Sequence, residues 1–249
     1  MKRLFLAALA VAALPCSPAL AQRERLRDRL APHPTETLYD ATVILAELSN
    51  IPAKGIPPAL MADAHGVIII PRVVKAGFVI AGSGGHGVVM AREKGGRWAD
   101  PVFVNFGGGS VGFQAGIEST DVVLVFRDRK SLDRLLEGKG KITLGADASV
   151  AAGPVGRQAM AGTDAKLQAE IVSYSRSRGL FAGVALDGSV IHSDANTNAM
   201  FKADTRPGVS KQVAGLNGVL DVLSSSTVPP EPVRVVPATG LPVEMPKRP

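Results

Sequence analysis

Apolar residues recur at steps of three and four in two segments near opposite ends of the chain. In the segment 35–49 the spaced residues are Leu38, Ala41, Leu45 and Leu48. In the segment 209–223 they are Val209, Val213, Leu216, Leu220 and Leu223. Because this spacing places apolar side chains on one face of a helix, it predicts two amphipathic helices that pack on a core. Shorter helices are expected at 57–64, 128–137 and 196–202.

The chain between residues 66 and 126 instead has short runs of β-branched and aromatic residues separated by glycines. The runs are 67–70, 78–81, 88–91, 102–106, 111–117 and 122–126. They predict antiparallel hairpins curled into a barrel or a strongly bent sheet, with the continuously apolar run 122–126 near its centre. Further strands are expected at 142–152 and 169–174, and a hairpin at 180–191. The predicted class is α+β, a curved antiparallel β-sheet or partial barrel packed by helices at its N- and C-terminal ends.

The two ends of the chain differ from this middle part. Residues 1–21 have a basic start, an apolar run and Ala19-Leu20-Ala21 before Gln22, which are the features of a cleavable secretory signal. Acylation of Cys16 is the alternative, but a proline precedes it where a lipobox has a small residue. A charged lead-in at 22–34 and a Pro-rich, disordered tail at 225–249 are expected to flank one domain at 35–224. We therefore predict an exported protein, periplasmic or secreted, that is soluble or peripheral to a membrane.

Composition limits the partners and the chemistry. The formal net charge of +6 falls to +4 without Lys2 and Arg3, an excess that permits anionic partners. One Trp and two Tyr are too few for the base-stacking surfaces of single-strand nucleic-acid binders, so nucleic acid is not an expected partner. The histidines are far apart in sequence, and cleavage after Ala21 removes the single cysteine. No metal site and no cofactor are therefore expected.

Two glycine-rich segments match enzyme motifs. The segment 82–87 matches G-x-G-x-x-G, but a β-rich run follows where a nucleotide site needs a helix, so we expect a tight hairpin turn there. The segment 108–112 matches G-x-S-x-G, which would make Ser110 a nucleophile with His192 as its base. Because the residues after Ser110 resemble a strand and not a helix, a serine hydrolase is the less favoured hypothesis.

An ordered series of short motifs extends from Ile56-Pro57 to Asn198-Ala199-Met200-Phe201. Between them lie Ala64-His65-Gly66-Val67, Trp98-Ala99-Asp100-Pro101, Gly112-Phe113-Gln114-Ala115-Gly116, Gly153-Pro154-Val155-Gly156-Arg157 and the segment 174–183. Over about residues 35–224 the series resembles the SYLF domain, a lipid-binding module that is also described as actin-binding in eukaryotic members. The resemblance implies structural roles for Gly77, Trp98, Pro101, Gly112, Gly116, Gly153, Pro154, Tyr174, Gly179, Phe181, Gly183 and Phe201.

This resemblance implies binding of phospholipid head groups at a membrane surface without catalysis, with an anionic phospholipid as the expected ligand. Basic residues at the ends of predicted elements are candidates for a head-group patch, each contributing about 1 kcal/mol near an anionic surface. They are Lys54, Arg72, Lys75, Arg92 and Arg97. The alternative is a structural or protein-binding module for an envelope protein, in which the Pro-rich tail is recognised as an extended peptide.

Overall fold

The structure is a computed structural model, and it describes seven stretches of the chain. They are residues 32–50, 55–77, 80–111, 116–137, 140–154, 168–177 and 180–225. The predicted signal peptide, most of the charged lead-in and nearly all of the predicted Pro-rich tail lie outside these residues, so those predictions stay as they are.

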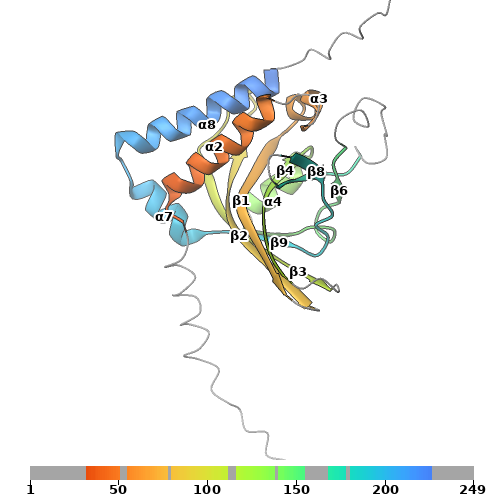
Figure 1. Cartoon of the computed structure of the whole chain (residues 1–249). Coiled ribbons are helices and arrows are strands. Elements are labelled where there is room, and N and C mark those ends of the chain that lie inside the picture. The colour runs from red at the N-terminus through yellow and green to blue at the C-terminus, as the bar shows by residue number, and fades with distance from the viewer. Residues whose placement is uncertain are drawn as a thin grey trace, which may run out of the picture.

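A strongly curled sheet of nine strands forms the centre of the described part of the chain (Figure 1). The strands are β1 (Gly66–Gly77), β2 (Ile80–Ala91), β3 (Val102–Val111), β4 (Gly116–Phe126), β5 (Lys141–Thr143), β6 (Val150–Ala152), β7 (Ile171–Ser177), β8 (Leu180–Gly183) and β9 (Val190–Ser193). Their order is β5-β9-β3-β2-β1-β4-β7-β6, with β8 also paired to β7. Only the β6–β7 pair is parallel among these strands. The predicted curved sheet is confirmed, and the apolar run 122–126 does lie in a central strand, β4.

Five helices are described, and the two long ones agree with the predicted amphipathic segments. They are α2 (Pro34–Asn50), α3 (Pro58–Ala62), α4 (Arg129–Glu137), α7 (Ala195–Ala203) and α8 (Pro207–Ser225). Helices α2 and α8 lie side by side across one face of the sheet (Figure 1). No helix in these stretches combines the length and the apolar character that crossing a membrane would require.

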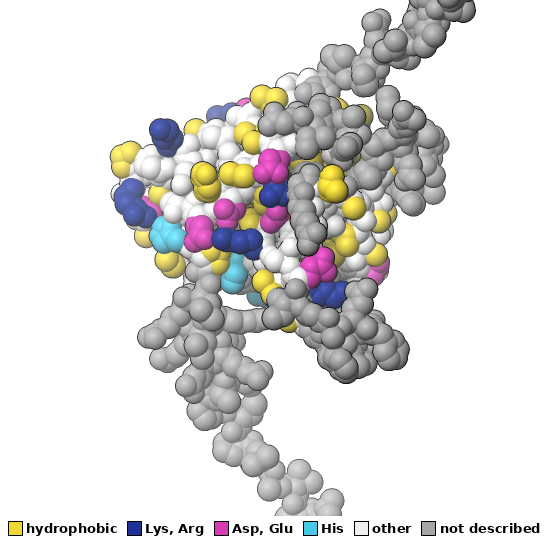
Figure 2. Space-filling view, viewed as in Figure 1, with side chains coloured by type: hydrophobic (Ala, Val, Ile, Leu, Met, Phe, Trp, Pro, Cys, Tyr) yellow, Lys and Arg dark blue, Asp and Glu magenta, His cyan; other side chains and the backbone are white. Residues whose placement is uncertain are grey.

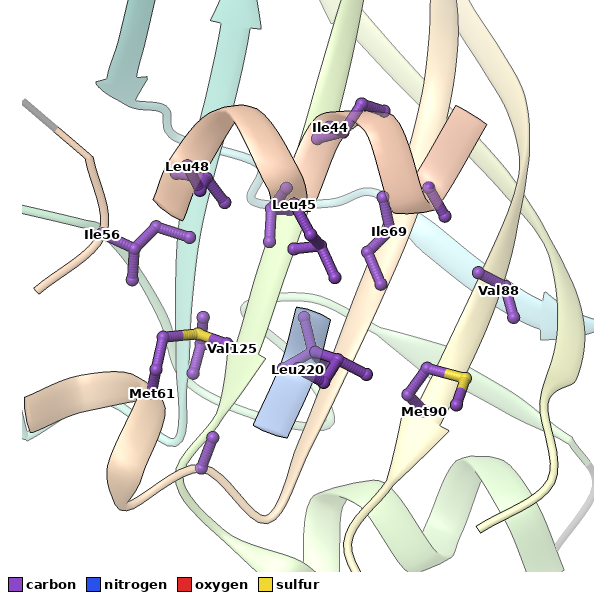
Figure 3. Close-up of a cluster of buried hydrophobic side chains, with 14 of the residues drawn as sticks. Ile44, Leu45, Leu48, Ile56, Met61, Ile69, Val88, Met90, Val125 and Leu220 are labelled. Carbon is purple, nitrogen blue, oxygen red and sulfur yellow. The ribbon is translucent and has the colours of Figure 1, made fainter. Parts of the chain in front are cut away.

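Two apolar cores lie on the two faces of the sheet. On one face, Leu45 and Leu48 of α2 and Leu220 of α8 pack on strand residues such as Ile69 and Val125 (Figure 3). On the other face, helix α4 contributes its buried leucines to a second core. Successive strand residues point to opposite faces, so a strand that is covered on both sides needs apolar residues throughout. This is the physical reason for the uninterrupted apolar runs in β1 and β4.

The prediction of a turn at residues 82–87 was wrong, because this segment lies inside β2. Its glycines pair with the glycines of β3, with Gly82 opposite Gly109 and Gly84 opposite Gly107. Glycine weakens an isolated strand, but here hydrogen bonds to the neighbouring strands hold the segment extended. A Cβ at Gly87 would lie 2.6 Å from the carbonyl oxygen of Ile69, so close approach of the backbones explains this glycine. Where they are described, the six predicted runs fall in only four long strands, and residues 112–115 of the predicted run 111–117 lie outside the described residues.

Two other predictions about strands were also wrong. The segment 142–152 is not one strand, because a turn separates β5 from β6 and these strands lie at opposite edges of the sheet. The segment 180–191 is not a hairpin, because β8 pairs with β7 whereas β9 pairs with β3 and β5. In both cases the partner strand is distant in sequence, so local pattern could not identify it.

Candidate functional site

A row of polar side chains crosses the sheet beside the core that α2 and α8 cover. His86 of β2 lies opposite Asn105 of β3, and Asn105 lies opposite His192 of β9. Residues directly opposite one another in antiparallel strands share a face. The next residues on this face, Val88 and Phe103, belong to the core under α2 and α8. The polar row therefore begins where that apolar core ends.

Arg72 extends this polar region toward α2. It lies in a β-bulge of β1 with a left-handed backbone (φ 49°), and its N–H donates to Asp121 Oδ1 at 2.9 Å. Its guanidinium group lies 2.7 Å from Glu36 Oε1 and 2.8 Å from Asp40 Oδ2 on α2. The hydrogen bond to Glu36 raises the pKa of Arg72. Burial raises the pKa of Asp40, and the charge of Arg72 opposes this effect. The bulge thus directs a cation into the acidic side of α2.

A second arginine joins α2 to the strands further along. Arg176 of β7 forms ion pairs with two carboxylates: its Nε lies 2.9 Å from Asp121 Oδ2, and its Nη1 lies 2.6 Å from Glu47 Oε2. The Arg176 side chain is only 18% exposed, so water screens these pairs less than it screens surface pairs. One carboxylate, Asp121, therefore binds both arginine residues, and α2 is tied to β1, β4 and β7.

A groove of about 1110 Å³ lies beside these residues, bounded by α2, β1, β2, β3, β9 and the start of α7. We call it the polar groove. Its lining includes Arg72, His86, Asn105, Asp194 and the glycines 107–109. Among the described residues, His86 Nδ1 and Asn105 Oδ1 are buried atoms without a hydrogen-bond partner. Figure 2 shows acidic, basic and histidine side chains gathered on the face that α2 crosses.

The four predicted head-group residues that the structure describes do not form one patch. Lys54 lies outside the described residues. Arg92 follows the end of β2, where Ala91 is opposite Gly66, whereas Lys75 is opposite Ser83 near the other end of the hairpin. Along β1, Lys75 lies nine residues beyond Gly66, which corresponds to roughly 30 Å of strand. Arg72 and Lys75 therefore lie far from Arg92 and Arg97, and whether either pair binds lipid stays a prediction.

Arg92 and Arg97 have different environments although both belong to the loop between β2 and β3. Arg92 donates to the carbonyl oxygens of Ala62 at 2.6 Å and Gly96 at 3.3 Å, and its guanidinium carbon lies 5.2 Å from the centre of the Trp98 ring. Arg97 is 85% exposed and pairs with Glu93 at 3.2 Å. Arg92 thus fixes the loop over Trp98, and Arg97 faces solvent.

Sequence reasoning missed the basic residues that adjoin this loop. Arg129 of α4 donates to the carbonyl oxygen of Arg92 at 2.6 Å and brings the segment 127–137 against the segment 92–100. We call these two segments together the basic end. It holds seven basic residues, Arg92, Lys94, Arg97, Arg127, Arg129, Lys130 and Arg134, and five acidic ones, Glu93, Asp100, Asp128, Asp133 and Glu137. The signal was present in the sequence as basic positions on the exposed side of the predicted helix 128–137.

Four residues of the family motifs contact one another at the β7 edge of the sheet. The Tyr174 ring is fully buried, and its hydroxyl donates to the carbonyl oxygen of Pro154 at 3.3 Å. A Cβ at Gly153 would lie 2.1 Å from the Tyr174 ring, and one at Gly183 would lie 2.2 Å from the Gly153 carbonyl oxygen. Burial raises the pKa of Tyr174. The motif glycines here leave the space that the tyrosine fills.

The remaining motif residues are spread over the domain. Gly77 and Gly116 are opposite each other where β1 pairs with β4. Trp98, Pro101 and Tyr174 are buried. The Phe201 ring lies 5.3 Å from the ring of Phe103. Phe181 is a residue of β8. Gly112 and Gly179 lie outside the described residues.

The geometry does not support a nucleophile at Ser110. Its motif begins inside β3, and the next described element is another strand, β4, whereas a nucleophile elbow joins a strand to a helix. Ser110 lies five residues beyond Asn105, which is opposite His192, so about 17 Å of strand separates the two. Within the described stretches no group of three or more His, Cys, Asp or Glu residues could hold a metal ion.

Comparison with known families identifies the domain. Residues 107–212 match the Ysc84 family, described as "Las17-binding protein actin regulator". The chain contains a Ysc84 (SYLF) domain. This SYLF assignment confirms the resemblance carried by the sequence motifs.

Three eukaryotic proteins are similar to this SYLF domain. SH3 domain-containing YSC84-like protein 1 of Xenopus laevis is 38% identical over 166 residues, which are 65% of this chain and 49% of the relative. The human protein of the same name is 37% identical over 166 residues, 65% of this chain and 48% of the relative. LAS seventeen-binding protein 3 of Saccharomyces cerevisiae is 40% identical over 151 residues, 60% of this chain and 32% of the relative. The chain thus matches about half of the animal relatives and a third of the yeast protein.

Proposed function

We propose that this SYLF protein binds phospholipid head groups at a membrane surface in the cell envelope, without catalysis, and that the basic end faces the lipid. The arrangement of the basic end supports this proposal. Two segments that are distant in sequence are joined by the Arg129 hydrogen bond, and they place seven basic residues against five acidic ones in one region. Lys94, Arg97 and Lys130 are exposed there.

The charge balance predicts weak binding. Two net positive charges at about 1 kcal/mol each give roughly 2 kcal/mol, or about a 30-fold preference for an anionic surface. Surface charges of this kind are screened at high ionic strength. We therefore expect reversible binding that depends on salt and on anionic lipid.

Co-sedimentation with vesicles tests the proposal. The protein is mixed with neutral or anionic phospholipid vesicles at low and high salt, and we expect binding only to anionic vesicles at low salt. Lys94→Glu combined with Lys130→Glu should abolish that binding. Lys75→Glu is the matched control, because it reverses an exposed charge at the far end of the β1–β2 hairpin. No binding to any vesicle would refute the proposal, and loss of binding with Lys75→Glu alone would move the lipid contact to the opposite end.

A protein-binding role is the second candidate. The family description and one relative's name both refer to binding of another protein, Las17 or "LAS seventeen". The polar groove is the feature of this chain that favours such a role, because lipid at the basic end would leave it accessible.

A further inference from the structure

A smaller pocket is bounded by the basic end and by helix α8. Its volume is about 360 Å³, which falls within the roughly 300–1,000 Å³ of small-ligand sites. Its lining comes from the loop before β3 and from one turn of α8, and it consists of Glu93, Arg97, Trp98, Ala99, Asp100, Asn217 and Asp221. We call it the acidic pocket, because this lining holds three carboxylates and one guanidinium group.

Two carboxylates of the acidic pocket have no cation beside them. Arg97 lies 3.2 Å from Glu93 Oε2, so its charge is already paired. Within the part of the chain that the structure describes, neither Asp100 nor Asp221 forms an ion pair. Both are exposed. The pocket therefore attracts a cationic group and repels an anionic one, unlike the basic residues around it.

The wall of the acidic pocket also contains two unpaired polar groups. Trp98 is only 5% exposed, and its indole Nε1–H has no acceptor among the described residues. Asn217 Oδ1 is a buried oxygen that likewise has no donor there. Each buried polar group without a partner costs free energy. A ligand that carries both an oxygen acceptor and N–H donors could satisfy the two groups together.

The pocket suits a primary ammonium group better than a quaternary one. A quaternary ammonium group has no N–H donor, and proteins bind it on the faces of aromatic rings. Trp98 is the one aromatic residue among the described lining residues, and the guanidinium carbon of Arg92 already lies over its ring at 5.2 Å from the centre. A primary ammonium group has three N–H donors, which suit Asp100, Asp221 and Asn217 Oδ1. Ethanolamine therefore fits this pocket and choline does not.

We propose that the acidic pocket binds the phosphoethanolamine head group of a phospholipid. The ammonium group lies between Asp100 and Asp221, and the phosphate lies toward Arg97 and the indole N–H of Trp98. This inference rests on the proposed lipid binding and extends it. The basic end attracts the anionic lipids of a mixed membrane, and the adjoining pocket selects a neighbouring lipid by its primary ammonium group. Soluble phosphoethanolamine has the same chemistry, so the test separates the two sources.

Co-sedimentation of the full chain with two kinds of vesicle tests the inference. Both contain the same fraction of phosphatidylglycerol, and the remaining lipid is either phosphatidylethanolamine or phosphatidylcholine. At low salt we expect about fivefold tighter binding to the ethanolamine vesicles, the size of one partly exposed ion pair. Because the anionic fraction is constant, attraction to the basic end is the same in both.

Two variants separate the pocket from the general effect of charge and of lipid packing. Asp221→Asn removes an exposed charge of the pocket and should abolish the preference for ethanolamine vesicles. Glu137→Gln is the matched control, because it removes an exposed charge of the basic end that does not line the pocket. Both changes favour anionic vesicles to a similar extent, so the ratio of binding to the two vesicle types is compared. Unchanged thermal midpoints verify the fold of both variants.

The possible failures are distinct. Equal binding of the wild type to both vesicle types overturns this inference and leaves the proposed lipid binding intact, as does an unchanged preference in Asp221→Asn or a lost preference in Glu137→Gln. No binding to either vesicle overturns the inference and the proposed function together. A fivefold effect is far weaker than a Kd of about 1 mM, so free phosphoethanolamine at that concentration should have no effect. If it abolishes the preference, the pocket binds a soluble amine and the assignment to lipid is wrong.

Discussion

Replacing Gly153 by alanine should strongly destabilise the domain. The added Cβ would lie 2.1 Å from Tyr174 Cζ and 2.5 Å from its hydroxyl oxygen, whereas ordinary contacts begin near 3.4 Å. The ring is fully buried, so it has no free space to enter. The backbone of Gly153 cannot retreat either, because its N–H is bonded to Ser173 and Gly183 packs directly against it. Either the ring or the backbone must therefore move by more than an ångström.

The expected loss can be worked out from these contacts. Overpacking of a rigid core costs about 1–3 kcal/mol. Displacement of the ring also breaks the hydrogen bond from Tyr174 to Pro154, at about 1 kcal/mol. The free energy of unfolding should fall by about 2–4 kcal/mol in total. At about 2–4 °C per kcal/mol, the thermal midpoint should fall by about 4–16 °C.

Urea unfolding followed by the fluorescence of Trp98, the one tryptophan, measures this difference. Gly82→Ala is the matched control, because its Cβ would meet nothing within 4 Å. We expect the control to change stability by no more than about 0.5 kcal/mol. Replacing the ring with Tyr174→Leu should cost much less in the Gly153→Ala background than in the wild type, since in that background loss of the ring also relieves the clash. Equal stability of Gly153→Ala and Gly82→Ala would refute the packing argument.

Two further predictions concern ionic contacts. Arg176→Met should lower the free energy of unfolding by about 3 kcal/mol, because it leaves Asp121, whose side chain is only 15% exposed, without the guanidinium group of Arg176. Urea unfolding checks this beside the exposed-pair variant Arg97→Met, which should change little. For Asp128, burial is the largest single influence on its pKa and opposes ionisation, but hydrogen bonds from Ser131 and Lys130 outweigh it and lower the pKa. The stabilisation from this carboxylate is therefore present above its ordinary pKa of 3.8 and is lost as pH falls through the lowered value of the folded state. Asp128→Asn should therefore reduce the loss of stability between pH 5 and pH 2, and identical pH profiles for this variant and the wild type would contradict the prediction. Asp128→Ala should also lower the free energy of unfolding by about 1 kcal/mol at pH 7, because it removes the cap of α4.

Local periodicity determined the helices and the character of the core. Leu38, Leu45, Leu216 and Leu220 are all fully buried, as their helical spacing predicted. This works because a helix forms its own hydrogen bonds, so one segment shows which face must be covered. The same reasoning identified Val122–Phe126 as a central strand, because a strand that is apolar on both faces must be covered on both.

Local pattern failed where glycine-rich segments form strands. Residues 82–87 have the composition of a turn, and they stay extended only because the glycines of β3 pair with them. A strand depends on hydrogen bonds to partners elsewhere in the chain, so its own residues do not reveal its limits. The separation of β8 from β9 went unpredicted for the same reason.

The candidate surfaces were likewise decided by tertiary structure. The sequence alone determined that the chain has a SYLF domain with amphipathic helices on a curved sheet, because the spacing of apolar residues predicts these elements and the ordered motifs identify the family. It could not show that Arg72 and Arg92 lie at opposite ends of the sheet, or that Asn105 lies between His86 and His192. Strand register sets those neighbours, and register arises from the packing of the whole sheet and not from any one segment.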